Sequence, residues 1–385
     1  MNINEGETRV RKGKKGVLLT LIISVFMILV ACSSETSKSG SAGGEGKTGE
    51  VIKLRAATGL SSQHAWWSAN MIPWMERVEE LTNGQVEFET FAGGELVSTH
   101  DEGDAVLSGT IDVGLVLPIY QPDQYAMAEI TMLPLAKSDA HIGSNAWKEL
   151  LNSDVELADG KTFTELQFGD FKIFPVATTQ EYSISTTGKE FKTAKDVKGT
   201  SLRTPSRIHE KYSEIIGINS VTMPAVEMYD SLSRGSFDGS YYSIADWSGY
   251  GFQDLFKYTV TGVNFGHFNA FIGMSNEKWD SLPKNVQDAM TQANEELFSK
   301  GADEWIKRSE EMTKQNEADG GKFVEFSTLD QSVQDLINKG IEDTWEDYAK
   351  LLEKQGQPGN KLVTLWRDII IEQGGDVPDG VKNMK

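Results

Sequence analysis

Strand-like and helix-like segments alternate along this chain from Val51 onward, and this alternation restricts the fold more than any other feature. Apolar and alternating patterns predict strands at 51–57, 85–91, 111–117, 171–177 and 182–186. Helical spacing predicts helices at 67–81, 102–107, 140–151, 206–216 and 225–234. After Pro283, a long helical run, interrupted only at Gly301, continues to about Asp319, and two further helices follow. Such elements, joined by short Gly and Pro connections, are typical of an α/β protein with largely parallel sheets.

The chain is acidic as a whole. It contains 57 Asp and Glu residues against 37 Lys and Arg residues, which gives a formal net charge of −20. A protein with this charge repels the phosphates of nucleic acid, so nucleic acid is not an expected partner. The 385 residues, of which 39% are hydrophobic, are enough for two well-packed domains.

The N-terminal segment has the features of a lipoprotein signal. Basic residues precede an uncharged apolar run at 17–30, and LVAC (29–32) resembles the bacterial lipobox, in which cleavage occurs before a cysteine that receives a lipid. We therefore expect residues 1–31 to be a signal peptide and Cys32 to be lipidated. Residues 32–50, rich in Ser, Gly, Thr and Lys, have the composition of a flexible tether. An uncleaved anchor helix is the alternative.

Two arginines stand close together in SLRTPSR (201–207), at the end of a predicted strand. In open sheets, ligands bind beyond the carboxyl ends of strands, and the helix that starts at Ser206 adds its positive dipole end there. A guanidinium fork suits a carboxylate because it donates two parallel hydrogen bonds. Arg203 therefore predicts a site for a small organic anion. The alternative is that Arg203 and Arg207 only neutralise surface carboxylates.

The sequence contains no recognisable catalytic motif. The five histidines lack the spacing of metal ligands, and there is no nucleophile elbow, Walker loop or dinucleotide fingerprint. We therefore expect the protein not to be an enzyme, and we expect no bound metal or cofactor. A secreted hydrolase would need an acid and a base in a cleft, and the sequence does not indicate such a pair.

Several short motifs occur together in a fixed order. They are LTNGQVEFETFAGGELVS (81–98), LSGTIDVGL (107–115), VKGTSLRTP (197–205), VTMPAVEMYDSLSRGSFDG (221–239) and SNEKWDSLPKNVQDAM (275–290). In this order and spacing they resemble the extracytoplasmic solute receptors of tripartite ATP-independent (TRAP) transporters, the DctP-like family. The resemblance extends from Val51 to the C-terminus. No single motif is diagnostic, but the ordered set is.

The resemblance implies a two-domain, hinged fold like that of periplasmic binding proteins, with discontinuous domains and a long connecting helix. Domain I would comprise 51–177 plus 268–306, and domain II would comprise 178–267 plus 307–385. The expected function is that of a monomeric, lipid-anchored receptor on the outer face of the cytoplasmic membrane. It would deliver a small organic acid to TRAP permease subunits. The alternatives are a receptor of an ATP-driven importer, a secreted hydrolase or a ligand sensor.

The family resemblance also assigns ligand-binding positions. Arg203 matches the arginine that binds the ligand carboxylate. The tyrosines Tyr241 and Tyr242 stand where many members have Gln-Glu-Asn-Pro, so a phenol at Tyr242 replaces the asparagine that contacts the ligand. Ala225 stands where some receptors for acid sugars have a pocket phenylalanine. These departures predict a pocket whose shape differs from that of those members.

A second ligand-binding arginine of many members falls near Ser183 in this chain. Arg207 would supply the missing positive charge, or else form a surface salt bridge on its helix. His64 and Trp66 are further candidates because they lie in the loop after the first strand. A partly aromatic cleft could include Trp66, Tyr241, Tyr242, Trp247, Tyr250, Phe265 and Phe268, with core or hinge packing as the alternative.

Overall fold

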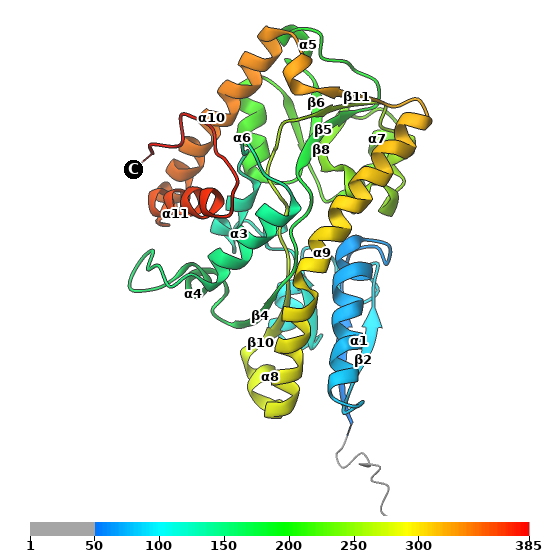
Figure 1. Ribbon diagram of the computed structural model, residues 1–385, viewed down its shortest axis with the longest axis vertical. Helices are drawn as coiled ribbons and strands as arrows, with labels where there is room; N and C mark the ends of the chain where they lie inside the picture. The colour runs from blue at the N-terminus through cyan, green and yellow to red at the C-terminus, as the bar shows by residue number, and fades with distance from the viewer. Residues whose placement is uncertain (1–50, 385) are drawn as a thin grey trace, which may run out of the picture. The chain divides into compact units, whose positions relative to one another are not determined.

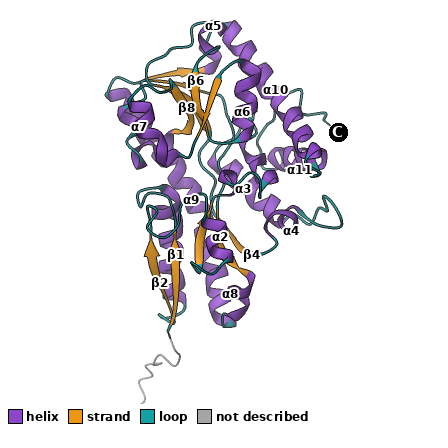
Figure 2. Cartoon of the chain, turned by 180° about the vertical axis from the view of Figure 1, so that it is seen from behind, coloured by secondary structure: helices purple, strands orange, loops and turns teal. Residues whose placement is uncertain are grey.

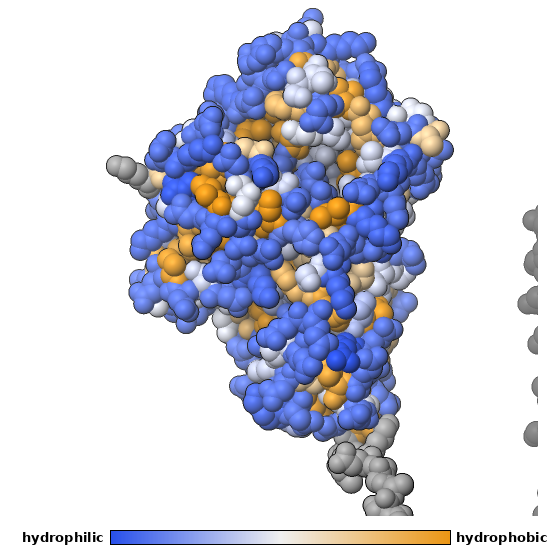
Figure 3. Space-filling model, viewed as in Figure 1, coloured by the Kyte–Doolittle hydropathy of each residue, from blue (hydrophilic) through white to orange (hydrophobic). Residues whose placement is uncertain are grey.

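The computed structural model of the protein describes residues 51–384 (Figure 1). The predicted signal peptide, the lipidation site Cys32 and the tether lie outside these described residues. On the face drawn in Figure 3, hydrophilic residues predominate, as the acidic composition leads one to expect. Within 51–384, no helix is both long and apolar enough to cross a membrane.

The first of two sheets has five strands. In spatial order they are β2 (Val86–Phe91), β1 (Ile52–Ala57), β3 (Val113–Val116), β10 (Phe271–Ser275) and β4 (Phe171–Pro175). The helices that follow these strands along the chain include α1 (Ile72–Leu81), α2 (Glu102–Leu107) and α8 (Asn276–Ser281). Strands distant in sequence therefore meet in one sheet, as a discontinuous domain requires.

The second sheet has six strands and forms a separate group in Figure 2. In order they are β11 (Lys322–Glu325), β9 (Tyr258–Thr261), β5 (Tyr182–Thr186), β8 (Gly239–Ser243), β6 (Ser201–Thr204) and β7 (Asn219–Thr222). Its helices include α5 (Ala194–Val197), α6 (Arg207–Ile216) and α7 (Met228–Ser233). The predicted α/β fold with two sheets is confirmed.

Both sheets are mixed, and the prediction of largely parallel sheets was wrong in this respect. In the first sheet, β10 runs antiparallel to β3 and β4, while in the second β5 runs antiparallel to β8 and β9. The remaining strand pairs are parallel. The strands β5 and β10 are the first to follow the extended segments that cross between the sheets. The chain therefore enters each sheet from the opposite direction at these two points.

The long helix α9 (Lys284–Ala318) provides the third connection between the sheets, because it leads from β10 and α8 to β11. It packs against α1 and α3 (Ala140–Asn152), and also against the 3₁₀ segment η5 (Ile244–Gly249). Figure 1 shows α9 running alongside elements of both groups. The predicted helix from Pro283 to about Asp319 is confirmed, but the predicted interruption at Gly301 is wrong, because Gly301 is buried within one continuous helix.

The two C-terminal helices pack on elements from different parts of the chain. Helix α10 (Gln331–Lys354) lies on α6, whereas α11 (Gly359–Glu372) packs on α3 and on the segment η3 (Ala126–Met132). Apolar faces account for this packing, since Ile337, Trp345, Leu362 and Trp366 are all buried.

Polar residues in the sequence determine where several helices begin. Asp139 accepts a hydrogen bond from the Ile142 backbone N–H and caps α3, and Ser206 caps α6 in the same way.

The helix predicted from 67 changes type near Pro73. It is a π-helix, η1, over Trp66–Met71, and α1 begins at Ile72. Proline lacks an N–H and favours the first turn of a helix, which explains the break at this point.

Gly266 lies in the second crossing segment, where the backbone approaches η3 closely. Its φ is +87°, and a Cβ atom there would lie 2.4 Å from Met132 backbone atoms. The neighbouring His267 N–H donates to the Thr131 carbonyl, and the Gly266 carbonyl accepts from the Tyr182 N–H at 2.9 Å. Only glycine combines this backbone conformation with this close approach.

We predict that Gly266→Ala lowers the free energy of unfolding by about 3 kcal/mol or more, because the substitution combines backbone strain with a steric clash. Gly374→Ala is the matched control. Gly374 also has a φ of +87°, but its surroundings are open, so it should lose only about 1 kcal/mol. Urea unfolding measures both values, and equal small losses would contradict the argument from close approach.

Candidate ligand-binding site

A small cavity lies among strands β5 and β8 of the second sheet, the segments that follow β1 and β3 of the first, and α9. Most of its lining is aromatic, and the rings are those of His64, Trp66, Tyr120, Tyr182, Tyr242, Tyr250, Phe268 and Trp305. The free space between them is about 10 Å³, which is room for about one water molecule. A larger ligand therefore requires these side chains, or the two sheets, to move apart.

Arg203, on β6, lies beside this cavity and is fully buried. Its Nε donates to the Met223 carbonyl at 2.8 Å, and its Nη atoms make two longer bonds of 3.4 Å, to the Tyr241 carbonyl and the Tyr120 hydroxyl. Its Cζ lies 5.7 Å from the centre of the Tyr242 ring. Within residues 51–384, no carboxylate is close enough to form an ion pair with it. A buried cation with only these partners can accommodate an anion.

Three tyrosine hydroxyls surround the same space as neutral groups. Burial raises the pKa of Tyr182, Tyr242 and Tyr250 well above the usual value, so all three keep their protons at neutral pH. The Tyr120 hydroxyl, besides contacting Arg203, accepts from the Ala225 backbone N–H at 3.3 Å. The site therefore offers one fixed cation and several protonated hydroxyls as hydrogen-bond donors.

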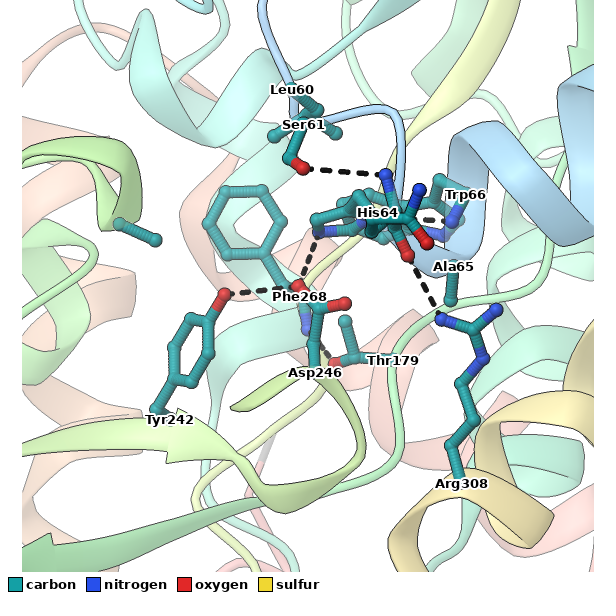
Figure 4. A network of polar contacts seen from close by, with 12 residues as sticks. Leu60, Ser61, His64, Ala65, Trp66, Thr179, Tyr242, Asp246, Phe268 and Arg308 are labelled. Atoms are coloured by element: carbon teal, nitrogen blue, oxygen red, sulfur yellow. Dashed lines mark hydrogen bonds and ion pairs between the residues drawn. The ribbon is translucent and has the colours of Figure 1, made fainter. Parts of the chain in front are cut away.

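A second polar centre joins residues far apart in sequence. The His64 Nε2 lies 2.9 Å from the Asp246 Oδ2, and the Tyr242 hydroxyl donates to the same oxygen at 3.2 Å. Figure 4 shows His64 and Tyr242 both pointing toward this carboxylate. Trp66 stacks on His64 with ring centres 5.1 Å apart, and its Nε1 donates to the Ala177 carbonyl in the first crossing segment. These contacts hold the loop after β1 against η5.

The structure brings five of the predicted site residues together. Arg203 lies beside the cavity, and His64, Trp66, Ala225 and Tyr242 line it. Their positions around one cavity agree with the roles expected of them, which stay predictions.

Tyr241 and Ser183 do not line the cavity. The Tyr241 hydroxyl lies 3.0 Å from the Ser213 Oγ, and its ring packs on His209. Successive residues of a strand face opposite sides, so Tyr241 points away from the space that Tyr242 enters. Ser183 is buried on β5, directly opposite Tyr242 in the pairing of β5 with β8.

Arg207 lies neither in the cavity nor in a surface pair on its own helix. Its Nε and backbone N–H both donate to the buried carboxylate of Glu129 in η3, each at 2.7 Å. Its charge is paired with Glu129 and, at 3.8 Å, with the exposed Asp123, so its salt bridges go to a segment far away in sequence and not to its own helix. Its role in ligand binding stays a prediction. Arg207 and Tyr120 also line a separate, open pocket of about 300 Å³, so Tyr120 stands between the two spaces.

Sequence reasoning did not single out Tyr120, Tyr182, Asp246 or Trp305 as cavity residues. Tyr182 and Trp305 lie close to the expected crossing points near 178 and 306, where cleft residues are concentrated in a hinged protein. Their closeness to these crossing points could have identified Tyr182 and Trp305 as cavity residues. Nothing local in the sequence distinguishes Asp246 or Tyr120 from ordinary surface residues.

Two mixed sheets, three connections between them and an aromatic cavity beside a buried arginine define a solute-binding protein of the hinged type. The model of the family described as "Bacterial extracellular solute-binding protein, family 7" (DctP) matches residues 57–350. The chain belongs to this family, so the predicted resemblance to TRAP solute receptors is confirmed. Members of the family are solute-binding proteins rather than enzymes, and they act outside the cytoplasm.

Known relatives cover most of the chain. A monocarboxylate 2-oxoacid-binding periplasmic protein from Nostoc sp. is 25% identical over 76% of this chain and 80% of its own length. A TRAP solute-binding protein from Rhodoferax ferrireducens, solved with copurified benzoate, is 18% identical and has a TM-score of 0.75 over 84% of this chain and 99% of its own. A marine metagenome TRAP protein, solved with 3-hydroxybenzoate, is 21% identical and has a TM-score of 0.76 over the same shares.

We predict a pH dependence of stability from the buried pair of Glu129 and Arg207. Burial raises the pKa of Glu129 from 4.5 to about 7, and the Arg207 charge opposes this shift. Glu129 therefore binds its proton more tightly in the folded state than in the unfolded chain. Its contribution to the free energy of unfolding is complete below pH 4.5 and is lost as the pH rises toward 7. Over this window the contribution amounts to about 3 kcal/mol.

Glu129→Gln should therefore flatten the decline in stability between pH 4.5 and 7.5, measured by urea unfolding at both values. Glu149→Gln is the control, because Glu149 is exposed on α3 and should leave the wild-type slope unchanged. A slope that is the same in all three proteins would show that Glu129 does not bind its proton more tightly on folding.

Proposed function

We propose that this protein is a lipid-anchored receptor that captures a small organic acid outside the cell and delivers it to a TRAP-type permease. The observation that carries the proposal is the fully buried Arg203 guanidinium, which has no anionic partner among residues 51–384. An acid that binds there would supply the missing negative charge, and its carboxylate would accept hydrogen bonds from the donor groups that face the cavity.

The ligands of relatives support this chemistry. The solved structures contain benzoate, 3-hydroxybenzoate and mandelate, and the Nostoc relative is described as binding monocarboxylate 2-oxoacids. All of these are carboxylates. The aromatic lining of the cavity favours a flat or ring-containing acid, because such a ligand stacks on aromatic side chains.

Closure around the ligand is the proposed mechanism. Domain I would comprise 51–177 plus 268–306, and domain II 178–267 plus 307–385, with the cavity between them. His64 and Trp66 would close on Arg203 and Tyr242 from the other domain. A ligand that contacts both domains stabilises the closed form through its higher affinity for that form. A monomer suffices for this action, and the permease would recognise the closed state.

We predict that Arg203→Ala weakens acid binding by about 3–5 kcal/mol, because the ligand carboxylate loses its buried partner. Native mass spectrometry of the purified receptor identifies a co-purified acid, and benzoate, mandelate and pyruvate serve as probes in a thermal-shift screen. Isothermal titration then measures the affinity. Arg234→Ala is the control, since Arg234 is exposed just after α7 and carries the same charge. If the affinity of folded Arg203→Ala protein for the acid falls by less than about tenfold, Arg203 does not hold the ligand carboxylate.

We also predict that Cys32→Ala releases the receptor from the membrane. Lipid attachment at the predicted lipobox requires the thiol, whereas the receptor's binding of acids does not depend on it. Detergent phase partitioning of cells that produce either form measures the distribution. The wild type should enter the detergent phase and the variant the aqueous phase, while equal partitioning would contradict the lipid anchor.

A further inference from the structure

The Asp246 carboxylate is the second charged group of the cavity, and it is incompletely paired. Asp246 is only 2% exposed. Its Oδ2 accepts hydrogen bonds from His64 and Tyr242, but its Oδ1 is buried and has no partner among the described residues. A buried carboxylate oxygen without a donor is unfavourable, so this atom marks a place for a hydrogen-bond donor.

Other unpaired polar atoms gather around the same space. Of the eleven buried side-chain atoms in residues 51–384 that lack a partner, four belong to residues that line this cavity. They are the Asp246 Oδ1, the Ser243 Oγ, the Tyr250 hydroxyl and the Trp305 Nε1. The other seven atoms do not belong to residues that line this cavity. A polar ligand that enters the cavity could satisfy the four that do.

Asp246 has no lysine or arginine partner within residues 51–384. The His64 Nδ1 accepts a hydrogen bond from the Trp66 backbone N–H at 3.2 Å, so Nε2 is the ring nitrogen that faces Asp246, at 2.9 Å. Among the described residues, no lysine or arginine forms an ion pair with Asp246. This end of the cavity therefore presents a carboxyl group, whereas the Arg203 end presents a guanidinium.

Tyr242 contacts both ends of the cavity. The Arg203 Cζ lies 5.7 Å from the centre of the Tyr242 ring, and the hydroxyl of that ring donates to Asp246. The same side chain thus touches the guanidinium and the carboxyl group. A ligand with a carboxylate at one end and a hydrogen-bond donor at the other could reach both.

We propose that Asp246, positioned by His64, selects small acids that also carry an O–H or N–H donor at a distance from the carboxylate. The inference rests on the proposed function, since Arg203 must hold the carboxylate. Hydroxy- and amino-substituted aromatic acids have this chemistry. A second carboxylate would be repelled by Asp246, and acids with acceptors alone, such as simple 2-oxo acids, leave its Oδ1 unpaired.

Isothermal titration with matched acids tests this selection. The probes are benzoate, 3-hydroxybenzoate, 3-aminobenzoate and isophthalate, which differ in one ring substituent. The wild type should bind 3-hydroxybenzoate or 3-aminobenzoate at least tenfold more tightly than benzoate, and isophthalate more weakly than benzoate. The ratio of the affinities for 3-hydroxybenzoate and 3-aminobenzoate shows whether the site prefers an O–H or an N–H donor. In Asp246→Asn the preference over benzoate should fall below threefold.

Asp254→Asn is the matched control, because Asp254 is exposed on the neighbouring segment and the substitution removes the same charge. It should keep the wild-type preference. Where Asp246→Asn does not fold, Tyr250→Phe replaces it, since this change removes one unpaired hydroxyl and should reduce the preference severalfold.

The outcomes separate the two proposals. If benzoate and its substituted forms bind equally to the wild type, or if the preference survives in Asp246→Asn, the role of Asp246 is overturned while the receptor function stands. Tighter binding of isophthalate or pyruvate than of 3-hydroxybenzoate overturns it as well. If no acid binds and Arg203→Ala behaves as the wild type, the receptor function itself fails.

Discussion

A buried guanidinium without a carboxylate partner is the constraint on which the rest of this structure depends. Arg203 is fully enclosed, yet its hydrogen bonds go to two carbonyls and one hydroxyl. The five N–H groups of an arginine are only partly satisfied by these contacts. Leaving a buried guanidinium partly unpaired is unfavourable, and an acid bound as proposed would supply the missing acceptors.

The cavity beside Arg203 leaves room for about one water molecule. Its tyrosines and tryptophans fill the space that an acid would need, so the described state is closed without a ligand-sized void. Under the proposed function, binding would exchange contacts among these rings for contacts with the ligand. Arg203 and Asp246 carry the polar atoms of this region that the rings alone do not satisfy.

Most elements could be predicted from the sequence because their signals are local. Strand patterns, helical spacing and the ordered motifs located β1, α3, α6 and α9 within a few residues. The direction of β5 and β10 could not be predicted, since it depends on where the chain crosses between sheets. The pairing of Arg207 with Glu129 and of His64 with Asp246 joins distant segments, and no local pattern indicates it. Successive side chains of a strand point to opposite faces of the sheet, so the sequence could have predicted that Tyr241 and Tyr242 do not face the same space.

Three chain connections link the two sheets: the extended segments before β5 and β10, and helix α9. A joint with a single linker can swivel freely, whereas three parallel linkers resist torsion and permit mainly bending about one axis. Relative movement of the two sheets is thereby restricted to a narrow path, and Gly266 sits where one linker touches η3. If the sheets separate, the aromatic cavity can widen only along that path.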